Sequence, residues 1–284
     1  MLSSLAQQSR PPDEVIVVDE DESSHTFVQE FPGLRLRTIV LPGSASAKRN
    51  AGFEAARPDI TLVGFMDDDI VLESTAIEAT VALWESAAAG LGGTSCNYAN
   101  PPRGIAQGLK GLAAWSRLGL YEGRPGNVAR SGFHTRVTAL QETTFAQWLP
   151  SGATFYGREV LDEFRFDEWF GSYSYLEDLD FSYRIGKRYK LAVVADARFY
   201  HYPSEVGRPS AYLFGKKEVL NRLYFVSKHP ELSRPLCCLA LCIRSLMSVL
   251  FGVTHFEADC FKRVAGNLAG TLAVLKGRWE ATRQ

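Results

Sequence analysis

The sequence lacks a cysteine framework. Its 284 residues include five cysteines, an odd number, and no two of them have C-x-x-C spacing. Three of them, Cys237, Cys238 and Cys242, lie in one apolar stretch. This pattern is typical of buried thiols in a reducing compartment, so we expect neither a disulfide framework nor a zinc site.

A charge excess of either sign is also lacking. The chain has 31 basic and 32 acidic residues, a formal net charge of -1, which argues against a nucleic-acid binder that relies on bulk charge. The opening "MLSSLAQQSRPP" has no apolar core before a cleavage site, so we expect no secretory leader. Internal repeats and low-complexity tracts are absent from the sequence too. The length suits one large domain, or one domain with an appendage.

Short apolar runs alternate with helical patterns in the first third of the chain. Strands are predicted at Glu14–Asp19, Leu34–Leu41 and Ile60–Met66, because these runs are rich in β-branched residues. A loop and then a helix are predicted over Pro42–Ala56, and a second helix over Ser74–Ala89. Alternating strands and helices indicate an α/β fold with a layered sheet.

The last part of the chain has a different composition. We expect a first domain over 1–205 and a helical extension over 206–284, whose segment 236–253 is almost wholly apolar. This segment is marginally long for a membrane span, and Arg244 lies near its centre, where a charge is costly. A helix on a membrane surface is the preferred prediction. A helix packed on the domain and a spanning helix are the alternatives.

Three consecutive acids, Asp67, Asp68 and Asp69, follow the third predicted strand. Ligands of open α/β sheets bind beyond the carboxyl ends of the strands. In extended backbone Asp67 and Asp69 point the same way, and two such carboxylates repel unless a cation lies between them. Mg²⁺ or Mn²⁺ suits these ligands and takes substrate phosphates for its other positions. The alternative is a solvated acidic turn that caps the following helix.

A second acidic cluster occurs in "YLEDLDFSYR", where Glu177, Asp178 and Asp180 begin a predicted helix. Acids at a helix N-terminus stabilise the helix dipole, which is one explanation. The other is that one carboxylate is a general base, which takes a proton from an acceptor hydroxyl. His201 follows a later strand and is either structural, a metal ligand or a phosphate contact.

Six segments occur in a characteristic order: "PDEVIVVDEDES", "GSASAKRNAGFEAA", "VGFMDDDIVL", "LPSGATFYGREVLDEFRFDEWF", "YLEDLDFSYRIGKRYKL" and "ARFYHYP". Together they resemble the family 2 glycosyltransferases, inverting sugar transferases of the GT-A fold. The resemblance spans about residues 1–205 and is similar in detail to rhamnosyltransferase-like members, which build bacterial cell-surface polysaccharides. It implies a Rossmann-like mixed sheet flanked by helices, here followed by the apolar helical extension.

The resemblance implies a role for each matching residue on the donor side. Asp19 would contact the nucleotide base, and Arg49 would lie near the nucleotide. Asp67 and Asp68 would approach the ribose and the metal region. Asp69 would ligate a divalent cation, Mn²⁺ or Mg²⁺. The donor would be a nucleotide-diphosphate sugar.

Further roles concern the acceptor and the chemistry. Asp178 would be the base, and His201 matches a position that binds metal or diphosphate in related enzymes. Trp148 and Trp169 would flank the acceptor side with Glu177, although core packing explains either tryptophan equally well. The acceptor would be a glycan or a lipid-linked saccharide, and the enzyme would act in the cytoplasm at the inner face of the plasma membrane.

The sequence departs from the family pattern in two places. Members normally have a strand like "VSVVIPTYNR" before the helix that leads to "EVIVVD", and its loss would expose two unpaired strand edges. Three explanations for the missing strand are open. The start codon is misplaced, the protein is a truncated and inactive remnant, or another element fills the gap in the sheet. The second departure is "DEDES", where the family prefers an Asp or Asn followed by Gly-Ser; Glu20 has a longer side chain.

Two other classes of protein compete with a transferase. "FMDDDIVL" also resembles the nucleophile loop of haloacid-dehalogenase-type phosphatases, but "EVIVVD" and "AKRNAG" then have no explanation. A non-catalytic transferase remnant, acting as a membrane-associated binding or scaffold protein, is the other alternative. The prediction is a metal-dependent inverting transferase.

Overall fold

The computed structural model describes residues 1–21, 28–87, 90–101, 113–171, 174–203 and 209–278. The chain forms two compact units. Unit 1 comprises Met1–Arg103, Arg136–Glu168 and Glu177–Ser204; unit 2 comprises Gly104–Thr135, Trp169–Leu176 and Glu205–Gln284. The last division between the two units lies between residues 204 and 205, one residue before the predicted end of the first domain at 205. Two earlier segments, which the sequence assigned to the first domain, belong to unit 2.

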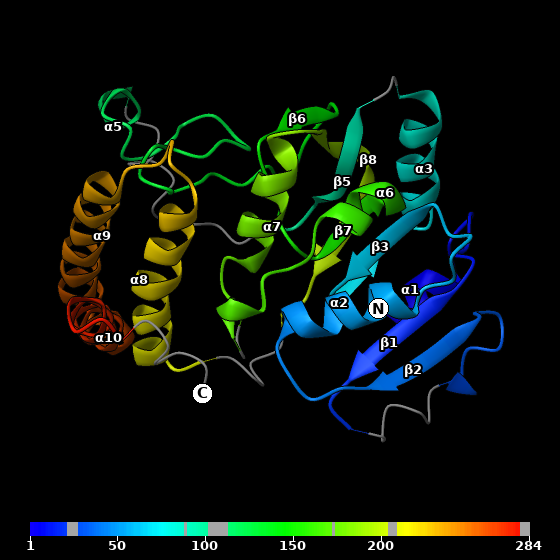
Figure 1. Cartoon of the computed structure of the whole chain (residues 1–284), viewed down its shortest axis with the longest axis horizontal. Helices are drawn as coiled ribbons and strands as arrows, with labels where there is room; N and C mark the ends of the chain where they lie inside the picture. Colours follow the sequence, from blue (N-terminus) through cyan, green and yellow to red (C-terminus); the bar gives the residue numbers. More distant parts are fainter. Residues whose placement is uncertain (22–27, 88–89, 102–112, 172–173, 204–208, 279–284) are drawn as a thin grey trace. The chain divides into compact units, whose positions relative to one another are not determined.

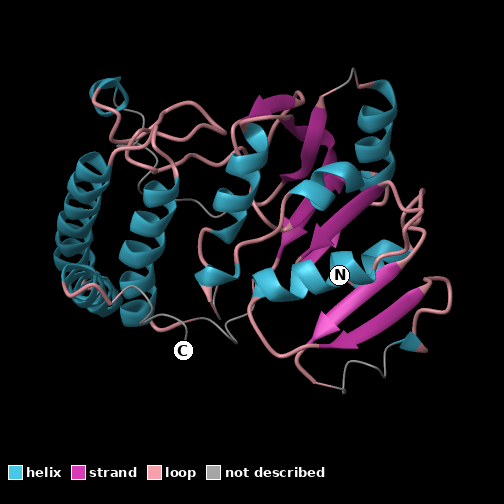
Figure 2. Ribbon diagram, in the orientation of Figure 1, coloured by secondary structure: helices cyan, strands magenta, loops and turns pink. Residues whose placement is uncertain are grey.

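Unit 1 is built on β-strands of mixed direction (Figures 1 and 2). The main sheet has the order β3-β7-β5-β8-β4, with β6 paired to β8. β5 and β8 are parallel, whereas the other pairs in this sheet are antiparallel. The strands are β1 (Val15–Asp19), β2 (Leu36–Val40), β3 (Leu62–Met66), β4 (Ile70–Leu72), β5 (Leu91–Tyr98), β6 (Thr144–Ala146), β7 (Ala153–Gly157) and β8 (Lys190–His201).

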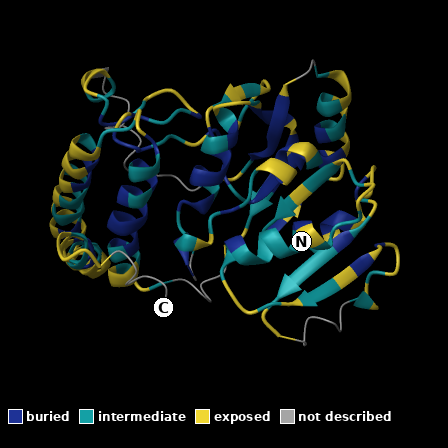
Figure 3. Cartoon of the chain, viewed as in Figure 1, coloured by how far each residue is buried: buried dark blue, intermediate teal, exposed yellow. Residues whose placement is uncertain are grey.

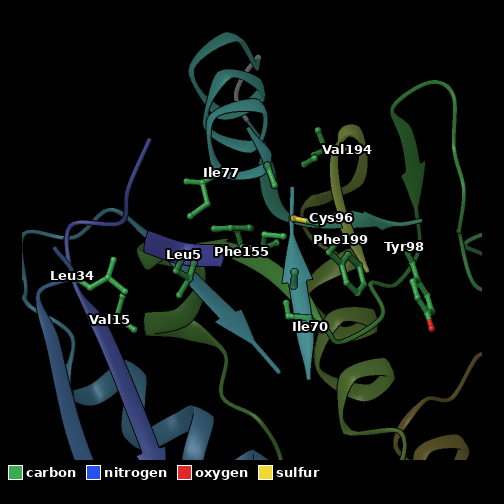
Figure 4. Close-up of a cluster of buried hydrophobic side chains, with 14 of the residues drawn as sticks. Leu5, Val15, Leu34, Ile70, Ile77, Cys96, Tyr98, Phe155, Val194 and Phe199 are labelled. Atoms are coloured by element: carbon green, nitrogen blue, oxygen red, sulfur yellow. The ribbon is translucent and has the colours of Figure 1, made fainter. Parts of the chain in front are cut away.

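The sheet of unit 1 is interrupted between β1 and β3. β1 and β2 form a separate parallel pair, and β3 is the edge of the main sheet next to β7. Within the described residues each of these two strands has one sheet partner, so the expected unpaired edges are present. Side chains bridge the interruption: Leu5, Val15 and Phe155 belong to one buried cluster (Figure 4).

Helices of unit 1 join and cover the strands. They are α1 (Leu2–Ala6), α2 (Ala45–Ala55), α3 (Ala76–Ser86), α6 (Arg158–Glu163) and α7 (Glu177–Gly186). α2 begins after Ser44, whose hydroxyl accepts a hydrogen bond from the Ala47 amide at 3.2 Å, as an N-cap does. The helices α2 and α3 lie within the predicted ranges. A short 3-10 turn, Glu168–Phe170, follows α6.

Unit 2 is helical in the residues that the structure describes. It contains α5 (Ala113–Arg117), α8 (Ala211–Lys228), α9 (Arg234–His255) and α10 (Ala258–Leu275). α8 and α10 cross in backbone contact: a Cβ atom on Gly215 would lie 2.1 Å from the Arg263 carbonyl oxygen, and one on Gly266 would lie 2.0 Å from that of Tyr212. Only glycine permits such an approach. α10 therefore lies close against α8 and leaves its opposite side exposed (Figure 3).

A buried carboxylate joins the three long helices of unit 2. Glu218 of α8 is 1% exposed and accepts hydrogen bonds from Arg244 of α9, and from Arg263 (2.8 Å) and Asn267 (3.2 Å) of α10. Burial alone would raise the pKa of Glu218, but the two guanidinium groups outweigh it and lower the pKa to about 2. Such a buried ion cluster is costly to break, because removing one partner leaves a charge unpaired.

Candidate active site

Arg49 connects three elements at the carboxyl ends of the strands in unit 1. It lies on α2. Its Nη2 atom is 2.9 Å from Oδ1 of Asp67, which follows β3, and its Nη1 atom is 2.9 Å from Oε1 of Glu177, the first residue of α7. Burial would lower the pKa of the Arg49 guanidinium, but Asp67 and Glu177 outweigh burial and raise it. Arg49 is therefore a permanent cation shared by two carboxylates.

Asn50, next to Arg49, fixes the floor of the site. Its amide group donates to the Phe166 carbonyl oxygen at 3.0 Å, and its Oδ1 accepts from the Phe166 amide at 3.0 Å. The Phe166 ring then lies under Arg49, with the guanidinium carbon 5.3 Å from the ring centroid. Asn50 was not among the residues predicted for the site. The only local sequence feature that could have indicated its role is its position directly after Arg49 in "AKRNAG".

The first turn of α7 carries two carboxylates of different character. Leu176, directly before it, has φ of 75°, an uncommon conformation for a residue other than glycine that is often found near functional sites. Glu177 is buried, and this burial, together with the Asp178 charge, raises the pKa of Glu177 to about 8 against the opposing effect of Arg49. Asp178 is only partly buried, and its Oδ2 accepts a hydrogen bond from the Ser151 amide at 3.1 Å.

Arg49 and Asp178 line the same pocket in unit 1, which is small and open to solvent. Gly152 on its wall has φ of 117°, and a Cβ atom there would lie 2.9 Å from the Phe199 ring, so a larger residue would strain the wall. The Gly152 carbonyl oxygen accepts from the Asp67 amide at 2.9 Å. The other lining residues are Phe65, Leu149, Ser151, Thr154, Tyr156 and Phe166.

Asp69 and His201 are brought together by strand pairing. β4 and β8 are antiparallel, with Ile70 opposite His201. Oδ2 of Asp69 lies 2.9 Å from Nε2 of His201. Asn100 holds the backbone of His201 with two hydrogen bonds of 2.8 and 3.0 Å. Both side chains are about a quarter exposed, 25% for Asp69 and 29% for His201.

A carboxylate oxygen and an imidazole nitrogen are suitable ligands for a divalent transition metal such as Mn²⁺. The pair Asp69 and His201 therefore fits the cation that the sequence predicts. Within the described residues, no group of three or more His, Cys, Asp or Glu side chains is arranged to hold a metal ion. Two protein ligands would leave the other coordination positions to water and to a ligand's oxygens.

The three consecutive acids do not continue the strand. The backbone turns at Asp68 and Asp69 between β3 and β4, so the predicted extended arrangement is wrong. Asp67 contacts Arg49, Asp69 contacts His201, and Asp68 is exposed. Each of the two partly buried acids therefore has its own cationic or polar partner.

Asp19 ends β1, and its Oδ1 accepts a hydrogen bond from the Glu20 amide at 2.6 Å. Glu20, the residue after Asp19, forms a salt bridge of 3.0 Å with Lys48, the neighbour of Arg49 on α2. The loop after β1 is therefore joined to the helix that carries Arg49. No contact in the described residues places the Asp19 side chain against Arg49 itself.

Trp148 departs from the acceptor-side prediction, whereas the acceptor-side role of Trp169 stays a prediction. Trp148 is 1% exposed, so it packs in the core and is not available to stack on a sugar ring. Trp169 belongs to unit 2, where its ring stacks on Tyr224 with centroids 3.6 Å apart. Local sequence did not distinguish a ring in the core from a ring on a binding surface.

Comparisons with known proteins agree with this architecture. A family model described as "Glycosyltransferase like family 2" matches residues 1–215. The fold is similar to that of a mannosyltransferase, PcManGT from Pyrobaculum calidifontis, solved in complex with GDP-Man and Mn²⁺. The TM-score is 0.57 at 15% identity, over 98% of this chain and 82% of that chain. No curated protein matches the chain.

Two further solved structures share the fold. One is GalNAc-T7 with UDP, GalNAc and Mn²⁺, with a TM-score of 0.54 at 16% identity over 74% of this chain and 41% of that one. The other is S. aureus TarS, with a TM-score of 0.52 at 17% identity over 88% of this chain and 40% of that one. The chain thus spans less than half the length of these two proteins.

The mixed sheet and its flanking helices define the GT-A class of α/β transferase folds. Because the family model covers most of the chain, the chain belongs to the glycosyltransferase-like family 2 and is a glycosyltransferase. The match includes "EVIVVD" and "AKRNAG", the two segments that a phosphatase leaves without explanation.

Proposed function

We propose that this chain is a metal-dependent, inverting transferase that moves a sugar from a nucleotide-diphosphate sugar to a glycan or lipid-linked acceptor. The observation that carries the proposal is the position of Asp178. Its partly exposed carboxylate lines the same pocket as Arg49, and the Ser151 amide fixes its orientation. A general base needs this combination of access and fixed geometry.

The proposed chemistry is a single displacement. Asp178 accepts the proton of an acceptor hydroxyl while the hydroxyl oxygen attacks the anomeric carbon of the donor sugar. The bond between that carbon and the diphosphate oxygen breaks, and the diphosphate leaves from the opposite face, which inverts the configuration. One base is enough for this reaction, and Asp178 is the carboxylate of the α7 pair that faces the pocket.

The charges of the site support a cation. The carboxylates of Asp67, Asp69 and Asp178 outnumber the single guanidinium of Arg49. A diphosphate is itself an anion, so this surface repels it unless further positive charge is added. A divalent cation held by Asp69 and His201 would supply that charge to the leaving diphosphate.

The acceptor and the cellular setting are proposed from the order of motifs. This order resembles rhamnosyltransferase-like members, which supports a role in bacterial cell-surface polysaccharide synthesis at the cytoplasmic face of the plasma membrane. All five cysteines are free, as suits a reducing compartment.

Thermal unfolding of the purified chain with UDP, GDP or dTDP tests the proposal, first with Mn²⁺ and then with EDTA. A ligand that binds only the folded state raises the unfolding temperature. We expect one nucleotide to raise it in Mn²⁺ and not in EDTA.

If no nucleotide changes cooperative unfolding, the proposal fails. The non-catalytic remnant is then favoured, and the interrupted sheet is the observation in its support. Binding without sugar transfer to any acceptor preparation would support nucleotide recognition but contradict the proposed reaction.

A further inference from the structure

We infer that unit 2 docks on the surface of a lipid bilayer that contains anionic lipids, through an apolar surface formed by α9 and α10. This surface is called the α9–α10 face. The inference uses residues of unit 2 alone, so it stands or fails independently of the proposed reaction in unit 1.

α9 has an exposed apolar stripe along one side. The stripe residues recur at intervals of three or four, which is the spacing of one helix face. Leu246, at the middle, is 60% exposed. The stripe consists of Leu239, Cys242, Leu246, Leu250 and Val253.

α10 has a second stripe with the same spacing. Leu268 is 63% exposed and Leu275 78%. Phe256, in the turn between the two helices, is 94% exposed in a left-handed conformation with φ of 56°. The α10 stripe consists of Phe261, Ala265, Leu268, Leu272 and Leu275.

The two stripes belong to neighbouring helices. α9 and α10 both pack on α8, and Figure 1 shows them beside each other. Exposed apolar area of this extent is unusual for a soluble protein and marks an interaction surface. The close glycine contacts of α10 with α8 hold its stripe on the outer side.

The charges around the face favour an anionic surface. α9 contains no acidic residue. Among the described residues from Arg234 to Arg278, the exposed cations are Arg234, Lys262, Lys276 and Arg278, against the acids Glu257 and Asp259; Lys262 is paired with Asp259 at 2.8 Å. The remaining two arginines of the segment are bound by Glu218. Amphipathic helices with cations at their margins bind anionic bilayers in the interface plane.

The same charges argue against two copies of this chain meeting through the α9–α10 face. Both copies would bring the same excess of exposed cations on these helices and their ends to the contact, and like charges repel. An anionic lipid surface attracts them instead. A lipid surface therefore fits the face better than a second copy does.

A helix that lies on the bilayer fits better than one that crosses it. Among the described helices, α9 alone is long and apolar enough to span a membrane by length and composition, and only 22% of its most apolar window is buried. However, Arg244, in the middle of α9, contacts Glu218 of α8. Insertion across the bilayer would separate this ion pair or take the charged α8 residue into the hydrocarbon, and both are costly.

Vesicle flotation of the full chain tests the inference. The probes are vesicles of phosphatidylcholine alone, and of phosphatidylcholine with about one third phosphatidylglycerol. We expect the wild type to float with the anionic vesicles and much less with the neutral ones. Because the double variant buries two fewer apolar side chains in the bilayer, Leu246→Gln combined with Leu250→Gln should weaken partitioning at least about tenfold.

A matched control is available in unit 2. Leu118 is 60% exposed, as Leu246 is, but lies outside the α9–α10 face. Leu118→Gln should float like the wild type. The circular dichroism spectrum and the unfolding temperature of each variant, both measured without ligand, show that folding is intact.

Three outcomes would overturn the inference. The first is absence of flotation with either vesicle. The second is a concentration-dependent dimer in lipid-free sedimentation, lost in the Leu246→Gln, Leu250→Gln variant, which would assign the face to a second copy. The third is a chain that resists extraction by carbonate and is protected from protease along α9, which would show a spanning helix.

Discussion

Nε2 of His201 lies 2.9 Å from Oδ2 of Asp69, at the point where the end of β8 meets the start of β4. The two residues come from distant segments, and backbone pairing between these strands brings them together. Asn100 fixes His201 from the other side through its backbone. Asp69 and His201 would hold the proposed cation in place of this direct contact.

This pairing predicts a non-additive loss of metal-dependent binding. Asp69→Asn and His201→Gln should each reduce the Mn²⁺-dependent rise in unfolding temperature caused by the nucleotide. The double variant should lose little more than either single one, because both residues hold the same ion. Titration calorimetry of nucleotide in Mn²⁺ measures this, with Asp196→Asn, an exposed acid of β8, as control. Additive losses would show that the residues act separately.

Asp178→Asn should reduce sugar transfer by about 10² to 10⁴, the range ascribed to a general base. The amide keeps the shape of the carboxylate but does not accept the acceptor's proton. Nucleotide binding should remain close to that of the wild type, because Asp178 is not among the proposed cation ligands. Initial rates and binding are measured on the same preparation. A fully active variant would remove Asp178 from the proposed reaction.

Glu177 predicts a pH dependence of stability. Its ordinary pKa of 4.5 is raised to about 8 in the folded chain, first by burial and then by Asp178. Between these values the folded state holds a proton that the unfolded state has released. The contribution of protonated Glu177 to the free energy of unfolding is therefore complete below about pH 4.5 and is lost as pH rises through about 8.

Urea unfolding of the wild type and of Glu177→Gln, followed from pH 5 to pH 9, measures this contribution. The free energy of unfolding of the wild type should fall with pH more steeply than that of the variant. Glu54→Gln, an exposed change on the same helix as Arg49, should keep the wild-type slope. Equal slopes in the wild type and Glu177→Gln would show that Glu177 is ionised throughout.

The crossing of α8 and α10 predicts a large difference between adjacent substitutions. Gly266→Val places side-chain atoms where the Tyr212 carbonyl oxygen already lies, so the helices must separate. The expected loss in the free energy of unfolding is about 1–3 kcal/mol or more, as for other overpacked sites. Ala265→Val, one residue earlier and exposed, should change it by less than about 1 kcal/mol. Thermal and urea unfolding of both variants test the difference.

Local patterns predicted the strands β1, β2 and β3 and the helices α2 and α3. The signals for these elements, runs of β-branched residues and helical spacing of apolar residues, lie within the elements themselves. The structure adds the N-cap of α2, Ser44. They also placed acids at strand ends. The link from Arg49 to Glu177 was not predicted, since the two lie 128 residues apart and only the folded sheet brings them together.

Local sequence patterns also could not predict which side chains are buried or to which unit each segment belongs. Trp148 is in the core because of neighbours from other elements, which its own sequence context does not reveal. The turn at Asp68 replaces an expected extended run because β4 reverses to pair with β8. The inclusion of Gly104–Thr135 in unit 2 depends on contacts with α8 and α9, far along the chain.

The interruption between β1 and β3 has a kinetic consequence. Within the described residues, β1 and β2 share sheet hydrogen bonds only with each other, while side chains of the Leu5 cluster and α2 connect them to the rest of unit 1. A segment held mainly by side-chain packing opens more easily than a central strand. Amide protons of Val15–Asp19 should therefore exchange with solvent sooner than those of β5, and a nucleotide that contacts Asp19 would slow that exchange.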